Sequence, residues 1–208
     1  MKQEDKVVIL ANGLFPTGPQ ALELLHAADL LVCCDGAADK LIAHGLLPQV
    51  IVGDLDSLSG ESKKKYASLL IQSDDQESND LTKAVAYCIG QGYSKASILG
   101  ATGMREDHTL GNISLMLEYY PRMEVQIISD FGLFSLVRSG EPVKSCIGEK
   151  ISLFSIDNRV CVSSRGLKYP LKDLQLSNWY TATLNEASAE SFTLHFDSET
   201  PIILYKAW

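Results

Sequence analysis

Two aspartates separated by a single residue, Asp54 and Asp56, form the most chemically informative pattern in the chain. They follow a short apolar run, and alternate residues of an extended segment point to the same side, so both carboxylates are expected to face one crevice. Two negative charges about 5 Å apart repel by roughly 3 kcal/mol at an effective dielectric constant near 20. A divalent cation relieves this repulsion, and oxygen ligands without a His/Cys cluster favour Mg²⁺ over zinc.

Further carboxylates occupy a polar segment, residues 75–80, that precedes a helix expected over residues 81–89. They add further oxygen ligands to those of the Asp-x-Asp pair. The Asp-x-Asp pattern by itself also occurs at the metal site of nucleotide-sugar transferases. That class of enzyme therefore stays as an alternative.

A glycine-containing segment, Gly100-Ala101-Thr102-Gly103, follows another apolar run. Glycines at this point permit close approach of the backbone to an anionic ligand, and Arg105 is able to hold a phosphate with two parallel hydrogen bonds. The third glycine of a dinucleotide fingerprint is missing, because Glu106 stands in its place, so NAD binding is not expected. The chain also lacks the P-loop pattern G-x-x-x-x-G-K-[ST].

Two more polar residues adjoin the candidate site. Asp35 directly follows a predicted strand, where an aspartate often only caps the next helix. His108 is the one histidine next to other candidate groups, and it is expected to orient Asp107 or to cap the helix that follows. Ligands bind at the carboxyl ends of strands in open α/β sheets, so these residues are expected to converge on one crevice.

The elements that position these residues indicate two domains. Continuous apolar runs are typical of strands buried on both faces of a parallel sheet. Helical patterns lie between them, which predicts a Rossmann-like α/β domain over residues 1–138. Short strand-like pieces then predict a small antiparallel β-sandwich over residues 139–208, with residues 139–142 as the linker. The strands are expected at residues 7–11, 30–34, 50–52, 96–99 and 125–128, and the helices at residues 19–28, 37–44, 61–70, 81–89 and 110–119.

Composition excludes several classes of protein. The 208 residues are 46% hydrophobic and 21% charged, which is typical of a chain that buries a core rather than a disordered one. A formal charge of -8 without a dense Lys/Arg block disfavours nucleic acid and anionic membranes as partners. No signal peptide or membrane-spanning run is evident, and the five cysteines form no C-x-x-C pair, so we expect a cytoplasmic protein with reduced thiols.

Taken together, these segments resemble the thiamine pyrophosphokinase family. The resemblance also extends to a downstream stretch, residues 166–171, and to Asn185-Glu186. It rests on Gly53-Asp54-Leu55-Asp56-Ser57, Asp75-Gln76, Asn79-Asp80-Leu81-Thr82-Lys83-Ala84, Gly100-Ala101-Thr102-Gly103, Arg105, Asp107-His108, Leu110 and Asn112.

The resemblance implies a homodimer in which thiamine lies between subunits, and a Mg²⁺-dependent reaction of ATP with thiamine that gives thiamine diphosphate and AMP. It also implies a β-sandwich that binds thiamine and forms the dimer. The residues implied to be catalytic are Asp54, Asp56, Asp80, Arg105, Asp107 and His108. Those implied to hold the metal are Asp54, Asp56, Asp75 and Asp80. Those implied to bind the substrates are Asp35, Asp75, Gln76, Lys83, Gly100, Thr102, Gly103, Tyr169 and Asn185.

Some positions depart from the family pattern. The segment after Asp35 lacks the usual double glycine, since Ala37 and Ala38 follow Gly36. Met104 stands where a glycine is common, and Leu184 stands where a serine is common. These changes remove no carboxylate, so two rivals remain: a nucleotide-sugar transferase, and a non-catalytic sensor of thiamine or nucleotide.

Overall fold

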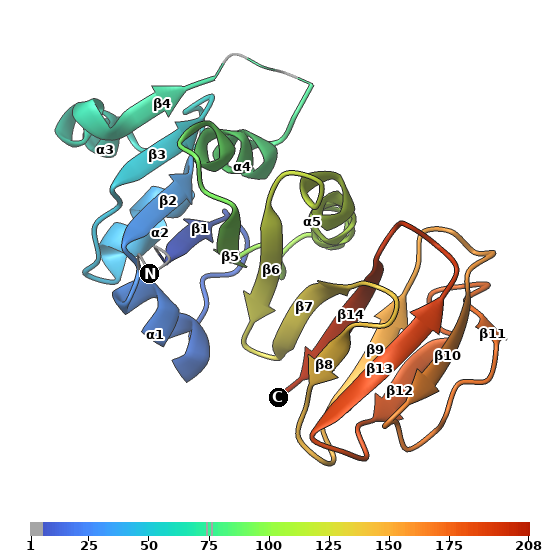
Figure 1. Cartoon of the computed structure of the whole chain (residues 1–208). Helices are drawn as coiled ribbons and strands as arrows, with labels where there is room; N and C mark the ends of the chain where they lie inside the picture. Colours follow the sequence, from blue (N-terminus) through green and yellow to red (C-terminus); the bar gives the residue numbers. More distant parts are fainter. Residues whose placement is uncertain (1–5, 74, 76) are drawn as a thin grey trace. The chain divides into compact units, whose positions relative to one another are not determined.

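The computed structural model describes residues 6–73, 75 and 77–208 (Figure 1). The chain divides into two compact units, Met1–Asp130 and Phe131–Trp208. This boundary lies earlier in the chain than the one between residues 138 and 139 that the sequence indicated. The reason is that Gly132–Val137 forms a strand, β7, whose residues pair along their whole length with the last strand of the second unit.

The first unit is built on a parallel sheet with the strand order β4-β3-β2-β1-β5-β6. The predicted α/β class is thus confirmed. The strands are β1 (Val7–Leu10), β2 (Leu30–Cys34), β3 (Val50–Gly53), β4 (Leu70–Gln72), β5 (Lys95–Leu99) and β6 (Glu124–Ser129). The central strands are buried because helices cover both faces of the sheet, as their continuous apolar sequences require.

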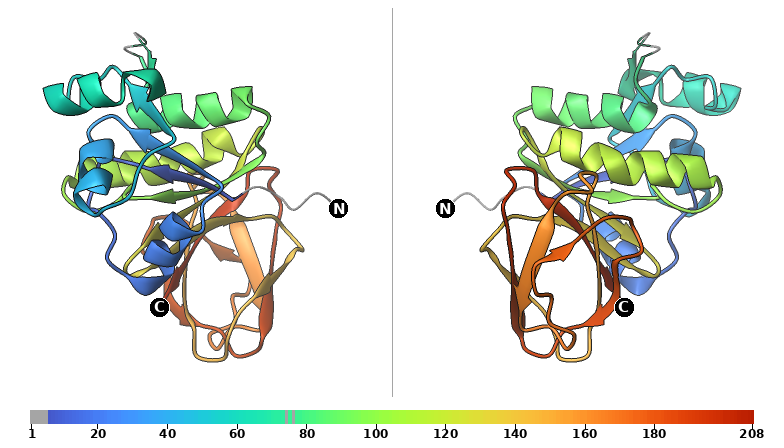
Figure 2. Two further views of the ribbon diagram at one scale, coloured as in Figure 1. Left: turned by 90° about the vertical axis from the view of Figure 1, so that its left-hand side faces the viewer. Right: turned by 90° about the vertical axis from the view of Figure 1, so that its right-hand side faces the viewer.

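The handedness of the crossovers between parallel strands decides which face of the sheet each helix covers. Such crossovers are right-handed, so the chain places α1 (Pro19–His26) and α2 (Ala37–Ala43) on one face while it moves from β1 outward. It then returns across the sheet to β5, and α4 (Asp80–Gly90) and α5 (Glu106–Tyr119) cover the other face (Figure 2). The reversal sets β1 beside β5, which is the switch point where ligands bind in open α/β sheets.

Two helices of the first unit differ from the sequence prediction. The helix expected over residues 110–119 begins earlier, at Glu106. The helix expected over residues 61–70 is shorter, because α3 (Gly60–Lys65) is followed by a single 3₁₀ turn, η1 (Ala67–Leu69). The chain then forms the edge strand β4, in which Leu70, Ile71 and Gln72 pair with the residues of β3. Pairing with β3 therefore overrides the local helical pattern.

The second unit is an antiparallel β-sandwich, as predicted. In one layer, β12, β9, β14 and β7 pair in that order, and the other layer has the order β11-β10-β13-β8. Apolar side chains such as Leu153, Leu194 and Phe192 fill the space between the layers. The strands are β8 (Pro142–Lys144), β9 (Lys150–Phe154), β10 (Cys161–Arg165), β11 (Leu174–Gln175), β12 (Ala182–Glu186), β13 (Ser191–Phe196) and β14 (Ile202–Ala207).

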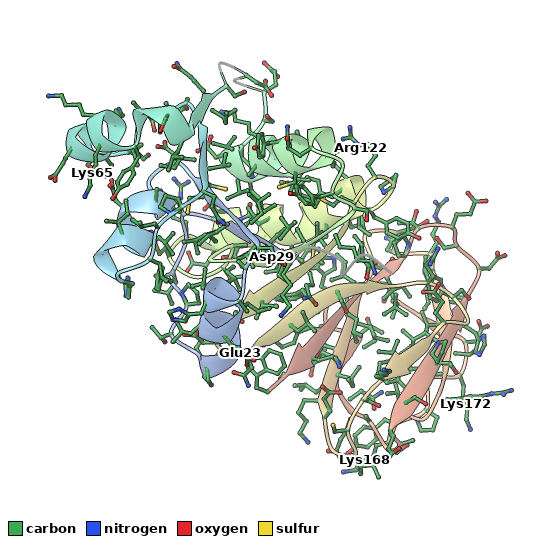
Figure 3. All side chains as sticks on the ribbon, turned by 60° about the vertical axis from the view of Figure 1, so that its left-hand side comes forward. Glu23, Asp29, Lys65, Arg122, Lys168 and Lys172 are labelled. Carbon is green, nitrogen blue, oxygen red and sulfur yellow. The ribbon has the colours of Figure 1, made fainter. Side chains whose placement is uncertain are left out.

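Charged side chains project from the surfaces of both units, as Lys65 and Lys172 illustrate in Figure 3. Among the residues described, no helix combines the length and apolar character needed to cross a bilayer.

Asp130 caps α1 from a distant position in the chain. Gly18, at the start of the helix, has no capping side chain, and the Asp130 carboxylate accepts hydrogen bonds from the Gly18 amide (2.8 Å) and from the Thr17 hydroxyl (2.7 Å). Partial burial acts to raise the pKa of Asp130, but these hydrogen bonds outweigh it and leave the pKa below its usual value. The ionised carboxylate is therefore the form that stabilises the fold.

We expect Asp130→Ala to lower the free energy of unfolding by about 1 kcal/mol, the typical value of a lost cap. Because the pKa is lower in the folded state, this stabilisation is complete above the unfolded pKa of about 3.9 and is lost as the pH falls through the folded pKa. Urea unfolding at pH 7 and pH 5 should give the same difference from the wild type, with a smaller difference below about pH 4. Glu23→Ala, which changes an exposed residue of α1, is the control.

Candidate functional site

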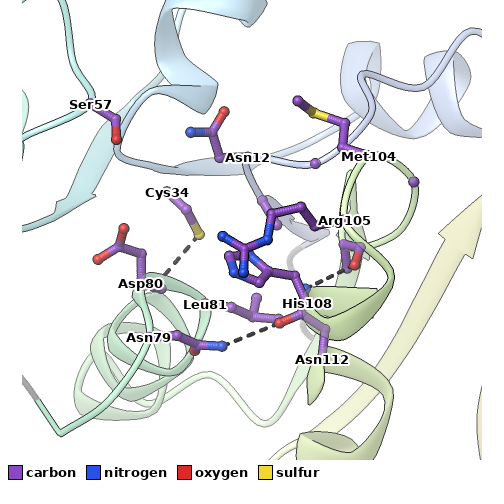
Figure 4. Close-up of a pocket in the computed structure, with 14 residues that line it drawn as sticks. Asn12, Cys34, Ser57, Asn79, Asp80, Leu81, Met104, Arg105, His108 and Asn112 are labelled. Carbon is purple, nitrogen blue, oxygen red and sulfur yellow. Dashed lines mark hydrogen bonds between the residues drawn. The ribbon is translucent and has the colours of Figure 1, made fainter. Parts of the chain in front are cut away.

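A pocket of about 310 Å³ opens at the carboxyl ends of the parallel strands of the first unit, at the switch point between β1 and β5 (Figure 4). It is lined by the loops after β1, β3 and β5, by the end of β2, and by the first turns of α4 and α5. The lining residues are Ala11, Asn12, Gly13, Cys34, Ser57, Asn79, Asp80, Leu81, Ala101, Gly103, Met104, Arg105, His108 and Asn112. Two of the predicted catalytic residues that follow β5, Arg105 and His108, thus meet Asp80 at one cavity.

An acidic cluster adjoins the Ser57 side of this pocket. One carboxylate oxygen each from Asp35, Asp54 and Asp56 lies within 4.8 Å of the other two, so these residues are able to share a metal ion. The sequence predicted that Asp54 and Asp56 converge, but the reason given was wrong. The segment is a turn rather than extended, because Leu55 has a φ of 68° and the Asp56 amide donates to the Asp54 carboxylate at 3.1 Å.

Asp35 is the buried member of the cluster. It is 1% exposed, and one of its carboxylate oxygens accepts a hydrogen bond from the Ser57 amide at 3.0 Å. The other oxygen, Oδ1, is buried and has no hydrogen-bond partner within the described part of the chain. Burial raises the pKa of Asp35 to about 6, and the charges of Asp80 and Asp56 act in the same direction.

These features fit a divalent metal ion. A buried carboxylate oxygen without a partner is costly, and two more carboxylates beside it increase the negative charge. A hard cation with oxygen ligands satisfies both conditions, and Mg²⁺ is bound in this manner in many proteins. The structure therefore adds Asp35, which the sequence had placed among the substrate-binding residues, to the set that could hold a metal.

Asp80 and Lys83 form an ion pair beside the acidic cluster. The Lys83 ammonium donates to the Asp80 carboxylate at 3.1 Å, and its side chain is almost fully buried. Asp80 also lies close to Gly53, where an added Cβ would be 3.2 Å from Asp80 Oδ1. Lys83 thus offsets part of the negative charge at this end of the pocket.

Asp75 lies outside the cluster that the structure forms from described residues. It is exposed, and its carboxylate accepts hydrogen bonds from the Glu77 amide and from the Ser78 hydroxyl within its own loop. The hydrogen bond from Ser78 holds its pKa below the usual range. Gln76, the other predicted binding residue of this loop, lies outside the described residues.

Glycines bring the loops after β1 and β5 into direct backbone contact. The Gly13 amide donates to the Gly100 carbonyl at 2.8 Å, and the Leu14 amide donates to the Thr102 carbonyl at 3.0 Å. A Cβ on Gly13 would lie 2.4 Å from the Gly100 oxygen, and one on Gly100 would lie 2.5 Å from the Ala11 oxygen. Thr102 thus contributes through its backbone, whereas Gly103 lines the pocket directly.

Arg105 and Asp107 form an exposed pair at the mouth of the pocket. Two guanidinium nitrogens of Arg105 donate to the two oxygens of Asp107, and the side chains are 70% and 62% exposed. Asp107 also accepts a hydrogen bond from the His108 amide at 2.9 Å, within the first turn of α5. The N-cap residue of this helix is Arg105, and the His108 side chain does not cap the helix but lines the pocket (Figure 4).

Tyr169 and Asn185 lie in the second unit and bond to each other. The Tyr169 amide donates to the Asn185 Oδ1 at 3.1 Å, and Asn185 Nδ2 donates to the Tyr169 carbonyl at 2.8 Å. Asn185 is 5% exposed, whereas Tyr169 is exposed. Asn185 therefore positions the backbone that carries Tyr169, and Tyr169 is the member of the pair that a ligand can reach.

Several lining residues were not identified from the sequence. Asn12 lies two residues after the end of β1, and an Asn-Gly pair after a buried strand is the signal that could have found it. Asn79 and Asn112 were noted only as parts of the family pattern. Their side chains bond to each other at 3.2 Å, and Asn112 also donates to the Ala101 carbonyl at 2.8 Å, which ties α4, α5 and the loop after β5 together.

Two family models of known proteins match the chain. Residues 21–128 match the family model for the thiamin pyrophosphokinase catalytic domain, and residues 132–205 match the model for the thiamin pyrophosphokinase substrate-binding domain.

Among similar proteins, thiamine pyrophosphokinase 2 of Arabidopsis thaliana is 27% identical over 208 residues, which cover 85% of this chain and 78% of that protein. Thiamine pyrophosphokinase 3 of Oryza sativa subsp. japonica is 32% identical over 142 residues, which cover 56% of this chain and only 53% of that protein. The crystal structure of yeast thiamin pyrophosphokinase has the same fold, with a TM-score of 0.81 at 20% identity, and the match covers 100% of this chain and 88% of that one.

Proposed function

Since the chain belongs to the thiamin pyrophosphokinase family, we propose that it transfers the diphosphate group of ATP to the hydroxyl of thiamine and releases AMP. The observation that carries the proposal is the acidic cluster with an unpartnered buried oxygen beside a pocket at the switch point of the sheet. A magnesium-bound triphosphate is the ligand whose charge and size match both features.

We assign the metal to Asp35, Asp54 and Asp56. Bound there, Mg²⁺ would offset the negative charge of the triphosphate oxygens during transfer. Asp80 then lines the pocket beside the cluster, and Lys83 restrains the Asp80 carboxylate through their ion pair. This assignment adds Asp35 to the metal ligands expected from sequence and omits two of them, Asp75 and Asp80. Asp75 is then left for contact with substrate.

Arg105 is the cation proposed to hold the phosphate groups. In the structure its guanidinium is paired with Asp107, but exposed ion pairs contribute only about 0–1 kcal/mol. Arg105 therefore loses little free energy when it leaves Asp107 for a phosphate. A guanidinium binds phosphate with the same two-point geometry. His108 adjoins Arg105 in the pocket and is proposed to act on the same phosphate region.

The reaction needs no covalent intermediate. The thiamine hydroxyl attacks the β-phosphorus of ATP, the new P–O bond forms, and the bond from the β-phosphorus to the bridging oxygen of AMP breaks. AMP leaves with that oxygen, and the hydroxyl proton passes to a carboxylate, Asp54 or Asp56. The protein acts chiefly by alignment and charge neutralisation, which is the usual basis of phosphoryl transfer.

We propose that thiamine binds to the second unit and that two subunits assemble around it. Thiamine carries a fixed positive charge on an aromatic ring, which favours aromatic platforms and acidic surroundings. Tyr169 is exposed in the motif that resembles the family signature, and an exposed apolar group formed by Trp179, Tyr180 and Leu184 is suited to a subunit contact. The Asn185 side chain holds the Tyr169 backbone through two hydrogen bonds.

The test is a product analysis with ATP, Mg²⁺ and thiamine supplied together and singly. AMP and thiamine diphosphate should form in equal amounts, and only when both substrates are present. ADP, or turnover of a nucleotide sugar, would favour the transferase alternative. Tight binding of thiamine and nucleotide without any product would instead support a sensor.

A further inference from the structure

We propose that Lys40 of α2 is a positioning residue for nucleotide binding, because its ammonium joins two loops that line the pocket. This inference rests on the proposed function, since it concerns the same nucleotide pocket. Lys40 itself does not line the pocket, so it acts through the residues that it holds.

The contacts of Lys40 use all three donors of a lysine ammonium. Its Nζ donates to the Asn12 carbonyl at 2.9 Å and to the Gly13 carbonyl at 2.8 Å. A third contact reaches the Met104 sulfur at 3.7 Å. Asn12, Gly13 and Met104 all line the pocket, and they come from two different loops, after β1 and after β5.

The loops after β1 and β5 both contain a feature that a nearby ammonium can stabilise. The loop after β1 turns two successive carbonyl oxygens toward Lys40, and their negative ends repel each other unless a donor lies between them. Met104 has a φ of 68°, a conformation that costs a residue with a side chain about 1 kcal/mol or more. The Lys40 ammonium offsets the charge of the two carbonyls and also contacts the Met104 side chain. Asn12 and Met104 lie along the same side of the pocket in Figure 4.

A second contact from the same helix supports this interpretation. His44, the C-cap residue of α2, lies four residues after Lys40, and its ring stacks on Phe15 with the centroids 3.9 Å apart and the planes 10° apart. Phe15 belongs to the same loop as Asn12 and Gly13. Lys40 and the C-cap of α2 therefore contact the loop after β1 at two points. Burial lowers the pKa of Lys40 from its usual value.

The experiment measures binding of Mg²⁺ with α,β-methylene ATP, an analogue that resists the proposed cleavage, by calorimetry on the full chain. We expect Lys40→Met to weaken this binding at least about tenfold. Lys40→Arg, which keeps the charge, should recover most of the loss. Lys64→Met removes an exposed lysine of α3 and should bind like the wild type.

The kinetic constants separate positioning from a general structural role. Lys40→Met should raise the KM for ATP at least about tenfold and leave the KM for thiamine within about twofold. Equal binding by the wild type and Lys40→Met would overturn the inference but not the proposed function, whereas no binding by the wild type would overturn both. If Lys40→Met does not fold, binding is measured instead with Lys40→Gln, which keeps a neutral donor. Wild-type binding by folded Lys40→Gln would contradict the role of the charge.

Discussion

Asp54→Asn is expected to lower the rate of thiamine-dependent AMP formation at least about a hundredfold, the usual scale for losing a charged group that acts in the transition state. Asp54 lies in a cluster whose carboxylate oxygens are within 4.8 Å of one another, so loss of one charge weakens the grip on a divalent metal. The variant keeps the turn, because the asparagine oxygen can still accept the hydrogen bond from the Asp56 amide.

Stability separates this effect from misfolding. Without metal, Asp54→Asn should unfold at or above the wild-type temperature, because one like charge has left the cluster. Mg²⁺ should raise the melting temperature of the wild type and not that of the variant. Glu118→Gln removes an exposed carboxylate of α5 outside the cluster and is the control. An activity loss that follows a matching fall in melting temperature would contradict a metal-binding role for Asp54.

Gly13→Ala is expected to destabilise the protein by about 3 kcal/mol, the upper part of the range for overpacked sites. The new Cβ would meet backbone atoms, at 2.4 Å from the Gly100 oxygen and 2.8 Å from the Thr102 oxygen. Neither can move without separating the loops after β1 and β5. For a domain of this size, the melting temperature should fall by roughly 6–12 °C.

Gly90→Ala is the matched control, since its Cβ would enter open space at the end of α4. Alanine is the better helix former by up to about 1 kcal/mol, so this variant should be as stable as the wild type or slightly more so. Gly13→Ala should also bind nucleotide more weakly than Gly90→Ala, because the separated loops form the pocket wall. Equal melting temperatures for the two variants would contradict the close packing of the loops.

The parallel sheet was predictable because burial on both faces leaves a continuous apolar signature. Strands with mixed exposure were harder. Leu70–Gln72 is an edge strand, and its only pairing partner among the described strands is β3, so no local pattern distinguishes it from the end of a helix. The strand Gly132–Val137 has a mostly half-buried pattern, and its pairing with β14 joins residues from opposite ends of the second unit.

The site was predictable where polar residues directly follow strands, as Asp54 and Asp56 do. The contribution of Asp35 was underestimated because a single aspartate after a strand is usually a cap. Its pairing with the Asp-x-Asp turn depends on β2 and β3 being neighbours, which the sequence does not state. The contact between Gly13 and Gly100 likewise depends on β1 lying beside β5. Long-range strand order is therefore the information that local sequence patterns lack.

The proposed function depends most on Asp35, Asp54 and Asp56 holding the metal that carries the triphosphate. Anomalous diffraction from crystals grown with Mn²⁺ and α,β-methylene ATP tests this assignment directly, since Mn²⁺ takes oxygen ligands as Mg²⁺ does. We expect a manganese peak bonded to oxygens of Asp35 and of the Asp54–Asp56 turn, with the analogue in the adjoining pocket. A nucleotide bound elsewhere, or manganese bound only by Asp75 and its loop, would contradict it.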